Sequence, residues 1–243
     1  METGEMLRKA GRWIEAGRCD EAASLLGDAM MQASLAAKRR IVALWEGLLD
    51  RTPFAASNLG LALMRGDGVP ADPERGAGLL RGVLGSGVPE LVGFAHNFLG
   101  HFYAGAFGAP ANLARAVAHF ERAAAGGGGE AAFNAGLILE QGNGIERDVA
   151  RAAANYRLGV RCGSAHSMTN LALLIMTGEV ADATPEDAAD LLQAAYAAGD
   201  ENAGAIMMVV SADVAACGAW GQFVGAAPRR GSGPRAARSA ARR

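Results

Sequence analysis

The stretch LEQGNGIERDVARAAANYRLGVRCG, residues 139–163, decides the fold, because its features recur elsewhere in the chain. Two glycines flank an asparagine, an aspartate follows, and an alanine-rich run then ends in Cys-Gly. A glycine-rich loop in front of a helix can bind a phosphate through backbone N–H groups. A phosphate loop, however, occurs once and follows a strand, whereas a structural turn recurs with every unit of a repeat.

The recurrence is regular when it is counted from an apolar anchor in the middle of each predicted first helix. The four anchors, separated by 40, 36 and 36 residues, are Leu59, Leu99, Ala135 and Leu171. The four additional residues of the first spacing, near Val88 to Leu91, are expected to lengthen the connection to the second unit. Seven residues after the anchors stand Gly66, Ala106, Gly142 and Gly178. Thirteen residues after them stand Asp72, Asn112, Asp148 and Thr184, and 28 residues after them Gly87, Gly127, Gly163 and Gly199.

Each of these columns has a physical role. Glycine tolerates a positive φ where a helix ends and the chain turns back. Asp, Asn and Thr side chains accept hydrogen bonds from the free N–H groups that begin the next helix. Each unit is therefore predicted to be a first helix, a glycine turn, a second helix and a glycine stop. We interpret Gly142-Asn-Gly144 as one copy of this turn and not as a phosphate loop.

The composition agrees with a helical chain. Of the 243 residues, 51% are hydrophobic but only 6% are aromatic, and few stretches alternate apolar and polar residues as strands do. We predict an all-α protein, a right-handed α-solenoid of helix-turn-helix repeats. The predicted domains are 1–51 (N-terminal helices, a cap or a degenerate repeat), 52–200 (four repeats), 201–224 (a partial fifth repeat) and 225–243 (a disordered arginine-rich tail).

The columns resemble those of a known family. The segments AASNLGLALMRGDGVPADPERG and AAFNAGLILEQGNGIERDVARAAANYRLGVRCG are similar to Sel-one-like repeats, which are longer relatives of tetratricopeptide repeats. The resemblance covers about residues 52–210, although the large aromatic of the first helix survives only as Tyr103. It implies an adaptor that holds other proteins, with the first helices lining a concave face. Some secreted relatives carry a cysteine pair in each repeat, and this chain has no such pairs.

Charge and cysteine content narrow the function classes. Six arginines and no acid follow Ala227, so a chain of net charge −2 has a body of −8 and a basic tail. This tail is the one part predicted to be able to contact nucleic acid or an anionic membrane. Most of the three irregularly spaced cysteines, Cys19, Cys162 and Cys217, are expected to be buried. The start of the chain lacks a secretory signal and residues 203–220 are too interrupted for a membrane span, so we expect a cytoplasmic protein.

No catalytic or metal-binding pattern stands out. His96 and His101 are too far apart around a helix to share a face, and His119 is predicted to fill the core. No Ser-x-x-Lys or Gly-x-Ser-x-Gly motif is present, and no His, Cys and carboxylate set has metal-ligand spacing. We therefore predict no enzyme, no cofactor and no metal site.

The resemblance also predicts a groove for a peptide or helix of a partner protein. Its residues lie one or two positions before each anchor, or two or five positions after it: Asn58, Leu61, Met64, Asn97, His101, Asn134, Leu137, Glu140, Asn170, Leu173 and Met176. Asparagine can donate to and accept from a peptide backbone, and Leu and Met suit apolar side chains. Two alternatives remain open: the asparagines bond a neighbouring helix, or Leu and Met pack against the next unit. Rival functions are a hydrolase built from groove residues and contact through the basic tail.

Overall fold

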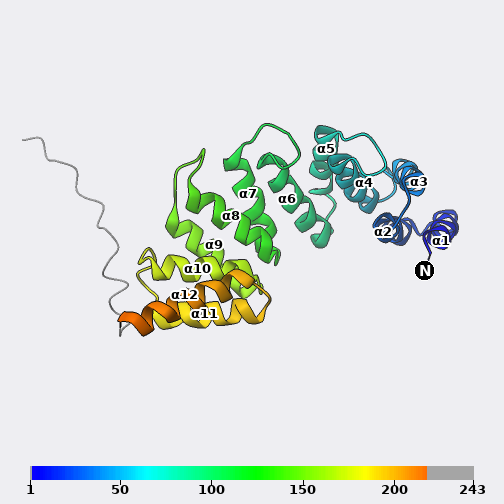
Figure 1. Cartoon of the computed structure of the whole chain (residues 1–243). Helices are drawn as coiled ribbons and strands as arrows, with labels where there is room; N and C mark the ends of the chain where they lie inside the picture. The colour runs from blue at the N-terminus through cyan, green and yellow to red at the C-terminus, as the bar shows by residue number, and fades with distance from the viewer. Residues whose placement is uncertain (1, 218–243) are drawn as a thin grey trace, which may run out of the picture.

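The computed structural model describes residues 2–217, and this part of the chain contains twelve α-helices and no strand. Successive helices follow one another along an arch, as the colours of Figure 1 show. The helices are α1 (Thr3–Glu15), α2 (Cys19–Met30), α3 (Leu35–Glu46), α4 (Pro53–Arg65), α5 (Pro73–Val83), α6 (Pro89–Tyr103), α7 (Leu113–Ala125), α8 (Gly129–Gln141), α9 (Val149–Arg161), α10 (Ala165–Met176), α11 (Pro185–Ala197) and α12 (Glu201–Cys217).

Four helix pairs form the middle of the arch: α4 with α5, α6 with α7, α8 with α9, and α10 with α11. Within each pair the contact is more extensive than the contact with the next pair along the chain. We call α4, α6, α8 and α10 the first helices and α5, α7, α9 and α11 the second helices. This arrangement is an α-solenoid of helical repeats.

The turn and cap chemistry of the sequence is present in each pair. The glycines that end the second helices, Gly87, Gly127, Gly163 and Gly199, all have a positive φ. Gly142 has φ 65° and ends α8 in the left-handed conformation, so the Gly-Asn-Gly segment is a turn. Each second helix is capped by the predicted side chain, and Thr184 forms a full capping box with Asp187. Where the second unit has Ala106, the positive φ moves to Gly105.

Each pair is held together by a small residue of the first helix against a large residue of the second. The small residues, one position after the anchors, are Gly60, Gly100, Gly136 and Ala172, and all four are buried. The three glycines face Leu80, Phe120 and Tyr156, none of which is more than 1% exposed, and Ala172 belongs to the same core cluster as Leu192. A Cβ at Gly136 would lie 2.5 Å from Cε1 of Tyr156, and one at Gly100 would lie 2.6 Å from Cδ1 of Phe120. The two helices of a pair can therefore approach closely only because these side chains are absent or small.

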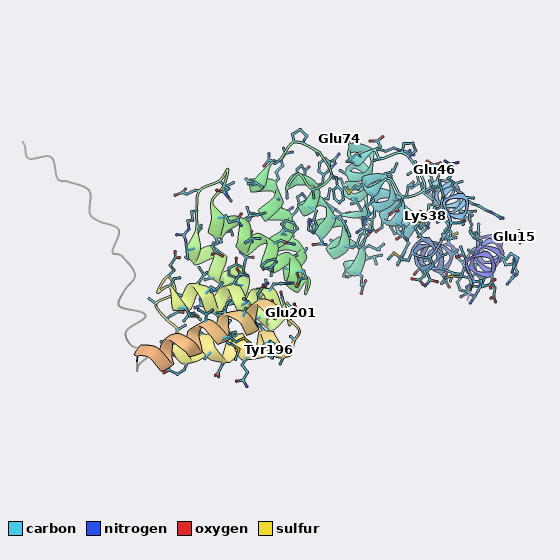
Figure 2. All side chains as sticks on the ribbon, viewed as in Figure 1. Glu15, Lys38, Glu46, Glu74, Tyr196 and Glu201 are labelled. Carbon is cyan, nitrogen blue, oxygen red and sulfur yellow. The ribbon has the colours of Figure 1, made fainter. Side chains whose placement is uncertain are left out.

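The N-terminal helices continue the array. Helix α2 contacts both α3 and α4, as a first helix would, and Trp45 and Asn58 both donate to the carbonyl oxygen of Ala23. Figure 2 labels Lys38 and Glu46 on α3; they pair with Asp67 (Nζ–Oδ1 2.9 Å) and Arg75 (Oε1–Nη2 3.1 Å) of the next unit. Asp20 does not cap α2, because the helix begins one residue earlier, at Cys19.

Two expectations about the repeats change. The four additional residues near Val88 to Leu91 do not lengthen a loop; they add a turn to the start of α6, which begins at Pro89 and is 15 residues long. His119 does not fill the core: it is half-buried, and its Nδ1 lies 2.9 Å from Nδ1 of His96.

At the C-terminal end, α12 packs on α11, and Ala203 is fully buried there. Cys19 is buried, as expected, but Cys162 is exposed because it lies at the end of α9. The predicted arginine-rich tail, residues 225–243, lies outside the described residues. None of the helices in residues 2–217 combines the length and the apolar character that crossing a membrane requires.

The close approach within a pair predicts that Gly136→Ala destabilises the fold. The new methyl group would overlap the ring of Tyr156, and we expect a loss of about 1–3 kcal/mol from overpacking. The matched control is Gly93→Ala in α6, where a Cβ would have no neighbour within 4 Å. There alanine should add about 0.5–1 kcal/mol through lower chain entropy. Urea unfolding gives the free energy of unfolding of both variants. A change of the same sign in the two variants would contradict the packing argument.

Candidate binding surface

The predicted groove residues lie on the first helices, which approach one another along the array. Helix α2 contacts α4, α4 contacts α6, and α8 contacts α10. Among the second helices of the described chain, α7 and α9 alone make a contact of comparable kind, and it is smaller. The first helices therefore approach one another more than the second helices do, although no more than a slight contact joins α6 and α8.

The four predicted asparagines are not equivalent. Asn58 donates from Nδ2 to the carbonyl oxygen of Ala23 at 3.2 Å, so it bonds the neighbouring helix α2. Asn170 donates to the carbonyl oxygen of His166 in its own helix at 2.9 Å. Asn97 and Asn134 are half-buried, and their side-chain amides make no hydrogen bond to the residues that the structure describes. These two amides are therefore free to bind a ligand.

The apolar members of the set also divide. Leu61 and Leu137 are half-buried, and Leu173 is 36% exposed. Met64 is only 3% exposed and packs with Ala77, Leu80 and Leu99 in the core, so it cannot line a groove. Met176 is half-buried and packs against the core cluster of the last pairs. Packing against neighbouring elements therefore accounts for both methionines, because five positions after the anchor the helix turns toward its partner.

His101 lies among aromatic rings on α6. Its ring meets Phe120 edge-on at 5.0 Å between centroids and lies 6.2 Å from Phe98, over which Arg65 places its guanidinium at 5.5 Å. Burial, and then the charge of Arg65, lower the pKa of His101 below its ordinary value. His101 is therefore a neutral, largely apolar element of this surface at pH 7.

Glu140 is engaged within its own unit. Its Oε2 accepts a hydrogen bond of 2.6 Å from the hydroxyl of Tyr156, which lies on α9. Burial and this carboxylate raise the pKa of Tyr156, so the phenol stays protonated and donates. Glu140 thus serves first to satisfy the buried hydroxyl of the tyrosine that faces Gly136.

A hollow of about 550 Å³ lies beside Asn97, and the sequence alone did not indicate it. One wall is the added turn of α6, with Pro89, Glu90, Gly93 and Phe94. The other wall is the backbone of Gly126 to Gly129 with Glu130. The four consecutive glycines were the available indication in the sequence, because residues without side chains leave space. The residues that face them belong to another helix pair, so the sequence alone did not show that a hollow forms there.

The surface offers shape and hydrogen bonding. Within the described chain no three His, Cys, Asp or Glu side chains are placed to hold a metal ion. His101 has no carboxylate partner there, and His166 pairs with the exposed Glu130 (Nδ1–Oε2 3.3 Å). What the arrangement can do is accept apolar side chains between leucines and bond a backbone through Asn97 and Asn134.

The engagement of Glu140 predicts a stability effect. Tyr156→Phe removes the hydroxyl donor and leaves the Glu140 carboxylate half-buried without it, so we expect a loss of about 1 kcal/mol in the free energy of unfolding. Glu140→Gln retains an oxygen acceptor and should lose less. Urea unfolding at pH 7 measures both. A larger loss for Glu140→Gln than for Tyr156→Phe would show that the carboxylate has another role in the fold.

Comparison with known proteins agrees with this geometry. The sequence pattern of the Sel1 repeat matches residues 53–81, 93–128, 129–164 and 165–200, which together make up more than half of the chain. Among curated protein sequences there was no match.

One solved structure shows the same fold, and a second is similar. A Sel1 repeat protein from Oxalobacter formigenes is 22% identical over 90% of this chain and 96% of its own, with a TM-score of 0.61. The protective antigen c5321 of uropathogenic Escherichia coli, which displays an SLR fold, is 16% identical over 91% of this chain and 59% of its own, with a TM-score of 0.45. Four matched repeats on an array of helix pairs lead to one conclusion: the chain belongs to the Sel1 repeat family.

Proposed function

We propose that this protein is an adaptor without catalytic activity, which holds an extended segment of a partner protein along its first helices. Sel1 repeat proteins are generally scaffolds for protein interaction. The observation that carries the proposal is the pair of free amides, Asn97 and Asn134, on neighbouring first helices. Ser167 Oγ is the one buried side-chain polar atom without a partner in the described residues, so both amides are open to solvent. A peptide backbone can supply both the donor and the acceptor that such an amide needs.

The packing of the helices supports the choice of face. Elements nearer the centre of an arch lie closer together than those outside it, and the first helices make the more extensive mutual contacts. Leu61, Leu137 and Leu173 keep part of their side chains exposed on these helices. A segment bound across them would bury apolar surface at about 25 cal/mol per Å². The backbone of the segment would reach the amides between these leucines.

The charge of the site suggests the character of the bound segment. Glu90 lies on one wall of the hollow and Glu130 on the other, and no cationic side chain lines it. Glu130 is already bonded by Ser164 and His166, whereas Glu90 makes no ion pair among the described residues. We therefore propose a mainly apolar segment that carries a Lys or Arg where it crosses the hollow. The cytoplasmic location stays a prediction.

The experiment is a peptide selection followed by variants. A displayed library of random peptides is selected on the full chain, and the affinity of a selected peptide is measured for each variant by calorimetry. The double variant Asn97→Ala and Asn134→Ala should bind at least about tenfold more weakly, because the peptide groups lose their partners in a half-buried site. Asn170→Ala is the matched control and should bind within about twofold of the parent, since its amide is already bonded to His166.

Two results would contradict the proposal. Peptides selected without loss of affinity in the double variant would place the binding face elsewhere. An equal loss for Asn170→Ala would indicate a general effect of the substitutions on the helices. Far-ultraviolet circular dichroism of all variants keeps binding separate from folding.

A further inference from the structure

Ion pairs link α3 with α5, and α7 with α9, in a similar register. Arg75, early in α5, pairs with Glu46 of α3. Arg151, early in α9, holds Glu121 of α7 through two bonds, Nε–Oε1 at 2.8 Å and Nη2–Oε2 at 2.7 Å. Asn155 adds a third, from Nδ2 to Oε1 at 3.2 Å. Although burial raises the pKa of Glu121, the bonds from Arg151 and Asn155 keep it below its ordinary value.

The boundary between α5 and α7 departs from this register. The positions of Arg151 and Asn155 are occupied one unit earlier by Arg115 and His119. The position of Glu121 is occupied one unit earlier by Arg81. The arginine of the next boundary is therefore kept and its asparagine is replaced by a histidine, but an arginine stands where that boundary has a carboxylate. Neither Arg81 nor Arg115 forms an ion pair with any residue that the structure describes.

The side chains at this boundary gather around Tyr103 of α6. Nη1 of Arg81 lies 3.4 Å from the hydroxyl of Tyr103, and the guanidinium of Arg115 lies 5.5 Å from the centre of its ring. The imidazole of His119 stacks on the same ring at 5.3 Å between centroids. His96 also belongs to this cluster, because its Nδ1 lies 2.9 Å from Nδ1 of His119. Arg115 and His119 occupy the positions of the two donors to Glu121, whereas Arg81 occupies the position of Glu121 itself.

The arginines of this cluster carry positive charge, and within the described part of the chain no carboxylate forms an ion pair with them. Burial, and then His96 and the arginines Arg122, Arg115 and Arg81, lower the pKa of His119 to about 4. Burial and Arg122 likewise lower the pKa of His96. The equivalent cluster one unit later is neutralised by Glu121. Arg157, which occupies the position of Arg81 two units later, pairs with Asp182 (Nη2–Oδ1 2.6 Å), whereas Arg81 has no carboxylate partner among the described residues.

We propose that Arg81, Arg115 and His119, the α5–α7 arginine site, bind a carboxylate that comes from outside the chain, such as an Asp or Glu side chain of a partner protein. The guanidinium fork of Arg115 would hold the carboxylate as that of Arg151 holds Glu121, and His119 would donate as Asn155 does. Arg81 supplies the second charge. The site lies on second helices, so it stands whether or not the first helices bind a peptide.

The first test uses acetate as the probe and the ring signals of the four histidines as the readout. At pH 7 and constant ionic strength, acetate should shift the NMR signals of His119 and His96 saturably and leave those of His101 and His166 in place. Arg115→Gln should weaken this response at least tenfold. Arg151→Gln, the matched change at the next boundary, should leave it intact. Equal shifts at all four histidines, or an intact response in Arg115→Gln, would overturn the proposal.

A parallel titration with inorganic phosphate separates the two common oxyanions. We expect phosphate to bind no more tightly than acetate, because the neighbouring boundary is built around one carboxylate. Tighter binding of phosphate would overturn the carboxylate assignment.

The second test gives the site its own carboxylate. Arg81→Glu restores the charge order of the next boundary, so Arg115 gains an internal partner and the response to acetate should disappear. This variant should also have a higher Tm than Arg81→Gln, which removes the charge without supplying a partner. Retention of the acetate response in Arg81→Glu, or a Tm below that of Arg81→Gln, would contradict the equivalence of the two boundaries.

Discussion

The close approach of the two helices in each pair is the constraint on which the rest of the array depends. A residue without a large side chain, such as Gly100 or Gly136, lets the ring of Phe120 or Tyr156 lie directly on the backbone of the first helix. The distance set there fixes how far the next pair must stand, since each pair contacts mainly its neighbours. A chain with few aromatic residues can form such an array because small residues let the two helices of a pair pack closely, so that fewer large side chains are needed to fill the core.

The packing of the helices decides which polar side chains are already hydrogen-bonded within the array and which are open to a ligand. The hydroxyl of Tyr156 needs a partner once its ring is buried, and Glu140 supplies it. The amide of Asn58 donates to the carbonyl oxygen of Ala23 in α2, whereas the side-chain amides of Asn97 and Asn134 have no partner among the described residues. Repeats that look alike in sequence therefore differ in the polar groups available to a ligand. The same logic separates Arg151, which is paired, from Arg115, which is not.

Much of the architecture was predictable from the sequence because its signals are local. A capping residue such as Asp148 acts on the three residues that follow it, and Gly142 acts on its own φ. Local rules also have limits. The residues before Leu91 were expected to lengthen a connection but form the start of α6, and His119 was expected to fill the core but is half-buried beside His96. In each case packing or position within the array, which one segment does not encode, decided the outcome.

The sequence by itself determined the repeat length, the helix ends, the turns and the family, because each depends on residues within one unit. Only the tertiary structure decided which groove candidates are available. Met64 and Leu61 are three residues apart on α4, yet Met64 is buried against α5 and Leu61 is only half-buried. A helix turns by about 100° per residue, so the two side chains point in different directions. The hollow beside Asn97 and the unpaired arginines near Tyr103 each combine residues of different units. Their proximity is set by how the pairs stack, and that is a property of the folded array.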